Sequence, residues 1–429
     1  MKNKTLVLGM GLLAFALIAC AQKYDDEKDF VVERIDDGAA VKITGYAGSK
    51  QEIRIPPQIE KTPVTAIGEG AFSDKQLTSA AIPHSVTVIE AKAFEKNQLT
   101  GMVIPDSVTA IGAWAFAENQ LTGVTIGKNV ATIGGKAFRG NQLTNVVISH
   151  SVTVIEEEAF AENQLTGVTI GNHVATIGEK AFTNNQLTNV VISDGVTSID
   201  DYAFSGNQLT SLTIGKNVTV IKHGAFAGNQ LTIVVIPDSV TSIRERAFRG
   251  NQLTSLTLGK NVATIGEEAF SHNQLTGVVI PPSVTLIGEE AFSNNQLTGV
   301  TIGNGVTAIR YAAFAHNKLT GVTIGSSVTT IGEEAFSNNQ LTEVVIPDSV
   351  TVIGDYAFAN NKLTGVTIGS GVTAIRYAAF ADNQLSSITI GGSVLVWTSA
   401  FDREFANFYV AQGRMAGTYT YSENQWSLN

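Results

Sequence analysis

Apolar positions recur along the chain with a fixed period of twenty-two residues. The clearest marker is a phenylalanine preceded by alanine, which returns fifteen times without a slip, from Phe72 to Phe380. A period in this range is typical of a solenoid, in which each repeat forms one coil of a continuous stack. A lone coil cannot bury its apolar face, so neighbouring coils must share it. The pattern therefore predicts one elongated repeat protein and not a set of globular domains.

Within one unit the apolar positions predict two short strands. In the segment 115–136, AFAENQLTGVTIGKNVATIGGK, Leu121, Val124 and Ile126 read L-x-x-V-x-I, the strand half of a leucine-rich repeat. Alternation points Val124 and Ile126 to one face. Residues 130–133 form a second β-like run, and the polar segment before the next phenylalanine suits a single helical turn. We expect a leucine-rich-repeat solenoid, mainly β, of about 15 repeats, with a parallel sheet, short second strands and single helical turns on the convex side.

An asparagine lies three residues after fourteen of the fifteen phenylalanines, and only the first unit departs, with Lys75. A side-chain amide at a fixed turn can satisfy the backbone of the adjacent coil, and asparagine tolerates left-handed backbone. We therefore interpret these positions as a structural ladder and not as a ligand site. Its representative members are Phe94, Phe116, Phe248, Asn119 and Asn251.

A second rhythm alternates over the first. The residue after the main strand is mostly proline or serine in one unit and glycine in the next, as in Pro105 and Gly127. Whole blocks also recur unchanged, such as Gly305–Ala315 at Gly371–Ala381. This copying indicates that the chain grew by duplication of blocks. Few units therefore have a sequence distinct enough for a chemical role of their own.

The N-terminus reads as an export signal. Lys2 and Lys4 precede an apolar run, and the sequence Leu17-Ile18-Ala19-Cys20 resembles the lipobox of bacterial lipoproteins. That resemblance implies cleavage before Cys20 and lipidation of its thiol. The alternative is an ordinary signal peptide whose cysteine is incidental.

The remaining boundaries follow from changes in pattern. We expect a signal peptide at 1–19, a solvated tether at 20–29, an N-terminal cap hairpin with a degenerate repeat at 30–60, the solenoid at 61–391 and a C-terminal cap at 392–429. Both ends of a solenoid need such caps.

Charge and motifs narrow the function. The net charge is −10, which disfavours nucleic acid and anionic membrane surfaces as partners. The chain carries one cysteine, none of its six histidines forms an i, i+4 pair, and no nucleotide-binding or serine-hydrolase motif is present. We expect no catalytic residues, no metal site, no cofactor and therefore no enzyme.

Large aromatic residues just before the phenylalanines are the candidate partner-binding residues, because exposed aromatics often anchor protein interfaces. They are Trp114, Tyr202, Tyr311, Tyr356 and Tyr377. The alternative is packing against the next coil. The outward strand positions, mostly threonine, valine and small residues, fit a plain sheet surface, a flat protein-contact surface or an ice-binding threonine array.

The chain resembles the BspA-like leucine-rich repeat family. The motif I-P-x-S-V-T-x-I-G-x-x-A-F is present from Ile104 to Phe116, and the tail 417–422, GTYTYS, is similar to the C-termini of spirochaete members. The period of twenty-two departs from the twenty-three of many members. The resemblance implies a bacterial surface protein that binds host matrix proteins or other cells and has no catalytic residues.

The sequence therefore favours an exported, lipid-anchored adhesin or protein-interaction scaffold at the outer membrane or cell surface. It would contact host extracellular matrix or other bacterial cells, with the lipid anchor as its only membrane contact. The alternative is a structural envelope or periplasmic spacer without a dedicated ligand.

Lipidation at Cys20 is directly testable. Cells grown with radiolabelled palmitate should incorporate label into the wild-type protein and not into a Cys20→Ser variant. Label that is absent from wild type, or that persists in the variant, contradicts the lipobox interpretation.

Overall fold

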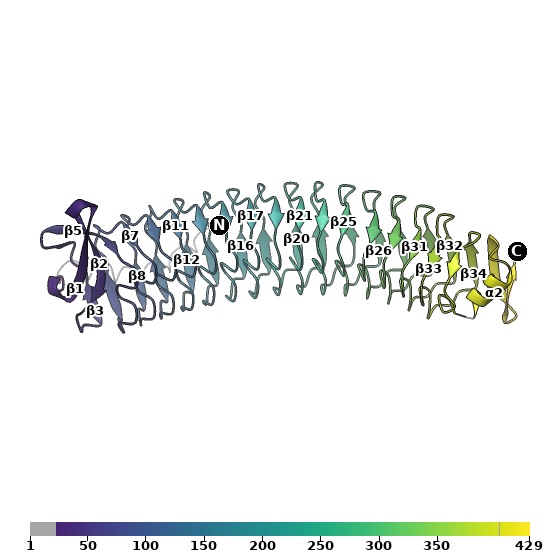
Figure 1. Ribbon diagram of the computed structural model, residues 1–429, viewed down its shortest axis with the longest axis horizontal. Helices are drawn as coiled ribbons and strands as arrows, with labels where there is room; N and C mark the ends of the chain where they lie inside the picture. Colours follow the sequence, from purple (N-terminus) through teal and green to yellow (C-terminus); the bar gives the residue numbers. More distant parts are fainter. Residues whose placement is uncertain (1–22, 403) are drawn as a thin grey trace, which may run out of the picture.

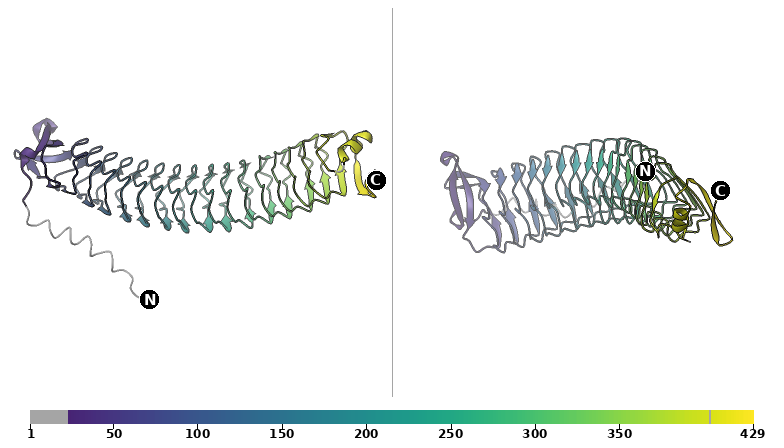
Figure 2. Two further views of the ribbon diagram at one scale, coloured as in Figure 1. Left: turned by 90° about the horizontal axis from the view of Figure 1, so that it is seen from below. Right: turned by 45° about the vertical axis from the view of Figure 1, so that its right-hand side comes forward.

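The computed structural model describes residues 23–402 and 404–429, so the expected signal peptide and Cys20 lie outside the described residues. The coils stack into a long, gently curved solenoid with a cap at each end (Figure 1; Figure 2, left). The predicted leucine-rich-repeat solenoid with a twenty-two-residue period is confirmed, because strand partners lie twenty-two residues apart, as in Ile111, Ile133 and Ile155. Among the described residues, no helix is long and apolar enough to cross a bilayer.

Each coil contributes one strand to each of two ladders. The first, the main ladder, contains β3 (Glu52–Arg54), β6 (Ser79–Ala81), β8 (Gly101–Val103), β10 (Gly123–Thr125), β12 (Asn145–Val147), β14 (Gly167–Thr169), β16 (Asn189–Val191), β18 (Ser211–Thr213), β20 (Ile233–Val235), β22 (Ser255–Thr257), β24 (Val278–Val279), β26 (Gly299–Thr301), β28 (Gly321–Thr323), β30 (Glu343–Ile346), β32 (Gly365–Ile368) and β34 (Ser387–Ile390).

The second ladder contains β5 (Thr62–Ile67), β7 (Val88–Ile89), β9 (Ala110–Ile111), β11 (Thr132–Ile133), β13 (Val154–Ile155), β15 (Thr176–Ile177), β17 (Ser198–Ile199), β19 (Val220–Ile221), β21 (Ser242–Ile243), β23 (Thr264–Ile265), β25 (Leu286–Ile287), β27 (Ala308–Ile309), β29 (Thr330–Ile331), β31 (Val352–Ile353), β33 (Ala374–Ile375) and β35 (Leu395–Val396). In the described part of the chain, these strands pair in parallel from coil to coil within one continuous sheet, which also includes β1, β2 and β4 of the N-terminal cap. The main ladder is divided into smaller sheets.

The divisions of the main ladder follow the alternation of glycine with proline or serine. From β8 onward, a strand pairs with the preceding coil only when glycine follows it, as β10 pairs with β8 and β14 pairs with β12. A Cβ at Gly127 would clash with the carbonyl oxygen of Pro105 in the preceding coil, and one at Gly171 would clash with that of Ser149. Proline and serine carry a Cβ at this position, and the pairing of the main ladder is interrupted before their coils. The solenoid is therefore largely built from two-coil units.

The expected single helical turns are corrected by the structure. The segment around each phenylalanine consists of hydrogen-bonded turns, because a residue two positions before the ring and another two positions after it adopt left-handed backbone. Around Phe270 these residues are Glu268 (φ 50°) and His272 (φ 56°). A left-handed residue interrupts a right-handed helix. Within the described residues, α-helix occurs only in the C-terminal cap.

The phenylalanines form a continuous column through the core. Consecutive rings from Phe72 to Phe380 and on to Phe401 stack with centroids 4.8–5.6 Å apart and planes within 3–14° of parallel. Phe94, Phe116 and Phe248 are fully buried. Each coil thus contributes one ring at the same repeat position, and the rings form a column within a core that also contains leucine, valine and isoleucine side chains.

The asparagines lie beside this column, with their side chains joining neighbouring coils. The Asn251 amide donates to the carbonyl oxygens of Phe226 (3.0 Å) and Phe248 (3.1 Å), and its Oδ1 accepts from the Leu231 backbone N–H at 3.1 Å. Asn119 makes the equivalent bonds, to the carbonyl oxygens of Phe94 and Phe116 and the backbone N–H of Leu99. Each asparagine side chain at this repeat position from Asn97 to Asn361 is buried. These amides therefore satisfy backbone groups of two coils at once.

The N-terminal cap is a hairpin of β1 (Phe30–Ile35) and β2 (Ala40–Tyr46), with short 3₁₀ turns η2 (Glu27–Asp29) and η3 (Asp36–Gly38) and strand β4 (Gln58–Ile59) beside it. A solvated tether was expected over residues 20–29, but in the described part of this range Asp25 and η2 belong to the cap. Asp25 is buried, pairs with Lys50 and accepts a hydrogen bond from the Arg54 backbone N–H at 2.6 Å. Asp25 therefore fixes this part of the chain to the cap. The sequence did not predict this contact, because Asp25 lies in a run of charged residues that resembles a solvated segment.

The C-terminal cap contains α2 (Phe405–Ala411), β36 (Gly417–Ser422) and β37 (Gln425–Leu428). Strand β36 lies antiparallel to β34, and Phe405 packs edge-on against Phe401 at 5.0 Å. The aromatic column thus ends under a covering of aromatic residues, and the last coil does not expose its core.

The asparagine column predicts a specific loss of stability. Asn251→Ala leaves the backbone groups of Phe226, Phe248 and Leu231 without this partner, so it should lower the free energy of unfolding by about 1–3 kcal/mol. The neighbouring Gln252→Ala, which changes an exposed side chain, is the control. Thermal or urea unfolding in which both variants match wild type rejects the ladder.

Candidate functional site

The five candidate aromatic residues lie on one surface, which we call the turn face. It is formed by the residues two or three positions before each phenylalanine and one or two positions after it. Trp114, Tyr202 and Tyr356 take the position two before and have left-handed backbone, with φ of 61°, 56° and 54°. Bulky residues rarely adopt this conformation, which costs roughly 1–2 kcal/mol per residue. Tyr311 and Tyr377 lie one position earlier.

In the N-terminal half of the turn face, the aromatic side chains are engaged by cations. The Lys136 Nζ lies 5.0 Å from the Trp114 ring centroid, and the Arg139 guanidinium lies 5.9 Å from it. Arg139 also forms ion pairs with Glu158 (3.2 Å) and Glu162 (2.7 Å), and the bond to Glu162 raises its pKa. Trp114 is therefore half-buried beneath neighbouring side chains.

Tyr202 packs closely on the following coil. A Cβ at Gly224 would lie 2.5 Å from the tyrosine ring, and Gly224 itself has a left-handed φ of 57°. The Tyr202 hydroxyl is 2.7 Å from Nε2 of His223, whose Nδ1 lies 3.4 Å from the Glu245 carboxylate. For Trp114 and Tyr202, the structure thus shows the packing contacts that the alternative interpretation expects.

The C-terminal half of the turn face differs, because its tyrosines are exposed. Tyr311, Tyr356 and Tyr377 are 38%, 39% and 44% exposed. The rings of Tyr356 and Tyr377 meet edge-to-face at 5.3 Å. The structure therefore brings two of the five candidates together and separates this tyrosine group from the half-buried Trp114.

Carboxylates surround these tyrosines without cationic partners. In the described part of the chain, no ion pair involves Glu289, Glu290, Glu333, Glu334 or Asp355. The negative charge of Glu334, followed by partial burial, raises the pKa of Tyr311. This half of the turn face is therefore both acidic and aromatic.

The outward positions of the main ladder form a smoother surface, with no comparable group of side chains. Val147 and Val235 are 60% and 59% exposed, and they alternate with coils that carry threonine at the same position. Where two threonine coils follow each other, Gly299, Gly321 and neighbouring residues line a shallow hollow of about 430 Å³. The valine interruptions remain inconsistent with an unbroken threonine array.

The edge beside this surface carries alternating charge, and its charges pair locally. Asp194 binds Lys216 at 2.9 Å and Asp238 binds Lys260 at 2.9 Å, so each pair joins two adjacent coils. The hydrogen bond from the Lys216 side chain lowers the pKa of Asp194. Exposed pairs of this kind contribute little to stability, because solvent screens the charges.

The described residues contain no group of three or more histidine, cysteine, aspartate or glutamate side chains placed to hold a metal ion. His272 and His316 lie at the same repeat position on the turn face, two coils apart.

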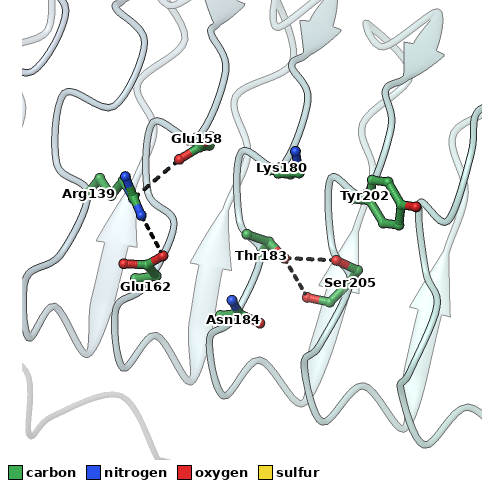
Figure 3. Close-up of a pocket in the computed structure, with 8 residues that line it drawn as sticks. All are labelled: Arg139, Glu158, Glu162, Lys180, Thr183, Asn184, Tyr202 and Ser205. Carbon is green, nitrogen blue, oxygen red and sulfur yellow. Dashed lines mark hydrogen bonds and ion pairs between the residues drawn. The ribbon is translucent and has the colours of Figure 1, made fainter.

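Sequence reasoning missed a cleft on the N-terminal half of the turn face. Its lining residues come from four successive coils and enclose about 350 Å³ (Figure 3). They are Arg139, Glu158, Glu162, Lys180, Thr183, Asn184, Tyr202 and Ser205. A signal was present, because Lys136, Glu158 and Lys180 alternate in charge at one repeat position.

Comparisons with known proteins agree with this architecture. The chain matches the family described as BspA type leucine rich repeat region (6 copies), over residues 65–188, 175–298 and 285–405. A leucine-rich repeat protein from Bacteroides ovatus is similar in fold, with a TM-score of 0.52, 20% identity and coverage of 84% of this chain and 92% of that one. A leucine rich cell surface protein from Faecalibacterium prausnitzii is 23% identical, with a TM-score of 0.42 and coverage of 92% and 98%. None of the curated proteins compared with the chain matches it.

The fold and the exposed coil surfaces define a leucine-rich repeat solenoid of the interaction-scaffold type. The chain belongs to the BspA-type leucine-rich repeat family, whose model matches most of its length. The family resemblance identified from the repeat motif is thereby confirmed.

The contact between Tyr202 and Gly224 gives a test of the packing on the turn face. Gly224→Ala should lower stability by about 1–3 kcal/mol more than Gly228→Ala, because both glycines are left-handed but only Gly224 lies beneath the ring. The extra loss should disappear in a Tyr202→Ala background. Equal losses for the two alanine variants in wild-type background contradict this packing.

Proposed function

We propose that the protein is a lipid-anchored adhesin or interaction scaffold of the cell surface, and that the C-terminal half of its turn face binds host matrix proteins or other cells. The observation that carries the proposal is the group of exposed tyrosines Tyr311, Tyr356 and Tyr377, beside carboxylates that form no ion pair within the described residues. Tyrosine supplies large contact area and is enriched among the residues that dominate binding energy.

The repetition of this surface supports a role in binding. Tyr311 and Tyr377 occur in the identical blocks Gly305–Ala315 and Gly371–Ala381, three coils apart. At a strand spacing of about 4.8 Å, the two tyrosines are separated by roughly 14 Å along the axis. One partner surface can contact both, and the surrounding carboxylates favour a partner with basic side chains.

The short distance from the expected anchor to the cap supports presentation at a membrane. Asp25, which is fixed on the N-terminal cap, lies five positions after Cys20, so five residue steps join the two. They span at most roughly 18 Å. A lipid on Cys20 would therefore hold the N-terminal cap close to the bilayer. The C-terminal half of the solenoid, whose sequence contains the three tyrosines, lies toward the opposite end of the molecule (Figure 2).

Binding through the tyrosines can be measured with purified protein on immobilised matrix proteins. The double variant Tyr311→Ala with Tyr377→Ala should weaken binding by at least about tenfold, since each hot-spot truncation costs roughly 1–2 kcal/mol or more. Tyr24→Ala, which removes an exposed tyrosine next to the N-terminal cap, is the matched control. Wild-type affinity in the double variant assigns these tyrosines no part in binding.

Location is tested separately, by adding protease to intact cells. A surface adhesin should be cleaved, whereas a periplasmic spacer should be protected until the outer membrane is opened. Protection of the chain in intact cells overturns the surface assignment and favours the envelope spacer.

A further inference from the structure

The cleft on the N-terminal half of the turn face is separate from the tyrosine group proposed to bind proteins. Figure 3 shows Arg139, Glu158 and Glu162 on one side of it and Tyr202 on the other. Its volume of about 350 Å³ is within the range of small-ligand sites, roughly 300–1,000 Å³. The cleft is therefore large enough to accept one or two rings of a small molecule.

The floor and far wall of the cleft are fixed by contacts between coils. The Thr183 hydroxyl lies 2.8 Å from the Ser205 hydroxyl and donates to the Ser205 carbonyl at 3.1 Å. Tyr202 is held over Gly224, and a Cβ at Gly206 would lie 2.7 Å from the Asn184 side-chain oxygen. Glycines in the following coils thus leave room for both side chains, and the cleft is shaped before a ligand arrives.

The charges that line the cleft balance. Arg139 is paired with Glu158 and Glu162, and Lys180 is bound at 2.7 Å to Glu179, just outside the cleft. An anionic ligand would compete with these carboxylates for the cations, and a cationic ligand would compete with Arg139 for the acids. A neutral ligand disturbs no ion pair. The balance therefore selects against charged ligands.

The same side chains retain hydrogen-bonding capacity on both sides. A guanidinium has five N–H donors and an ammonium three, and a carboxylate has about four acceptor sites, so Arg139, Lys180 and Glu162 keep some unused. The exposed Asn184 amide supplies two donors and an acceptor. The Tyr202 ring provides the apolar part of the lining. Many donors and acceptors beside one aromatic ring match a ligand that carries several hydroxyl groups on a compact, partly apolar ring.

We propose that this cleft binds carbohydrate, in the form of neutral sugar rings at the end of a glycan. Sugar hydroxyls donate to Glu162 and accept from Lys180 and Asn184. The C–H face of a ring packs against Tyr202, beside the Lys180 Nζ that lies 5.8 Å from the centroid of the tyrosine ring. The site gives the protein a second mode of attachment, independent of the exposed tyrosines.

The test uses the purified full-length protein in detergent on an array of neutral oligosaccharides of glucose, galactose, mannose and N-acetylglucosamine, with sialylated and sulfated counterparts. Neutral members should bind in preference to their charged counterparts, with affinities then measured by calorimetry. Glu162→Gln and Tyr202→Ala should each lower the affinity at least about tenfold, which is typical of losing a buried or charge-assisted contact.

Two controls share backbone positions with these variants but lie outside the cleft. Glu118→Gln has the repeat position of Glu162, and Tyr356→Ala has that of Tyr202; both should bind carbohydrate as wild type does. The proposal is overturned by absence of binding to every neutral oligosaccharide, by binding to charged members only, or by cleft variants that bind like the controls. The exposed tyrosines proposed to bind matrix proteins lie outside the cleft. A wild-type protein that binds immobilised matrix proteins but no neutral oligosaccharide therefore rejects this site and leaves the proposed adhesin intact.

Discussion

The structure depends on one repeated contact, in which a buried asparagine side chain bonds the backbone of two coils. The Asn251 amide donates to the carbonyls of Phe226 and Phe248, while its oxygen accepts from the Leu231 N–H. A buried polar group without a partner costs about 1–3 kcal/mol, so only one register between coils satisfies all of these atoms. The stacked phenylalanine rings supply apolar burial at the same place. Together they fix the coil spacing, and every surface of the molecule inherits that spacing.

The buried phenylalanine and asparagine positions are nearly constant along the solenoid, whereas the residues of the turn face vary from coil to coil. Glycine at Gly127 lets its coil approach Pro105 closely, and the resulting two-coil unit was copied along the chain. The turn face is under weaker constraint, because its residues need only tolerate a left-handed turn. Cation, acid and aromatic side chains therefore accumulate there in different orders. In the N-terminal half of the turn face, the charged side chains form ion pairs and line a neutral cleft. In the C-terminal half, tyrosines are exposed beside carboxylates that form no ion pair. Two chemically distinct surfaces therefore lie on one scaffold.

Much of the fold could be predicted from the sequence, because a strict repeat makes one coil's pattern evidence for all. The spacing of Phe116 and Asn119 indicated the solenoid and its polar column directly. The prediction of helical turns was wrong. Acidic residues such as Glu268 occur both at the start of a helix and in a left-handed turn, so they did not distinguish the two. Docking of Asp25 and the partial burial of Trp114 depend on neighbours in other coils, which spacing alone does not reveal. The cleft was missed for the same reason: its lining comes from four coils, and no single unit contains it.

Local hydrogen exchange tests the central claim most directly. In an Asn251→Ala variant, mass spectrometry should show faster exchange of backbone amides in the two coils around Phe226 and Phe248, with Leu231 among them. Coils that lie three or more coils away from these two should keep the protection of the wild-type protein, because each coil is coupled mainly to its neighbours. Unchanged protection around Leu231, or an equal loss of protection along the whole chain, would contradict the account of coils held in register by their asparagines.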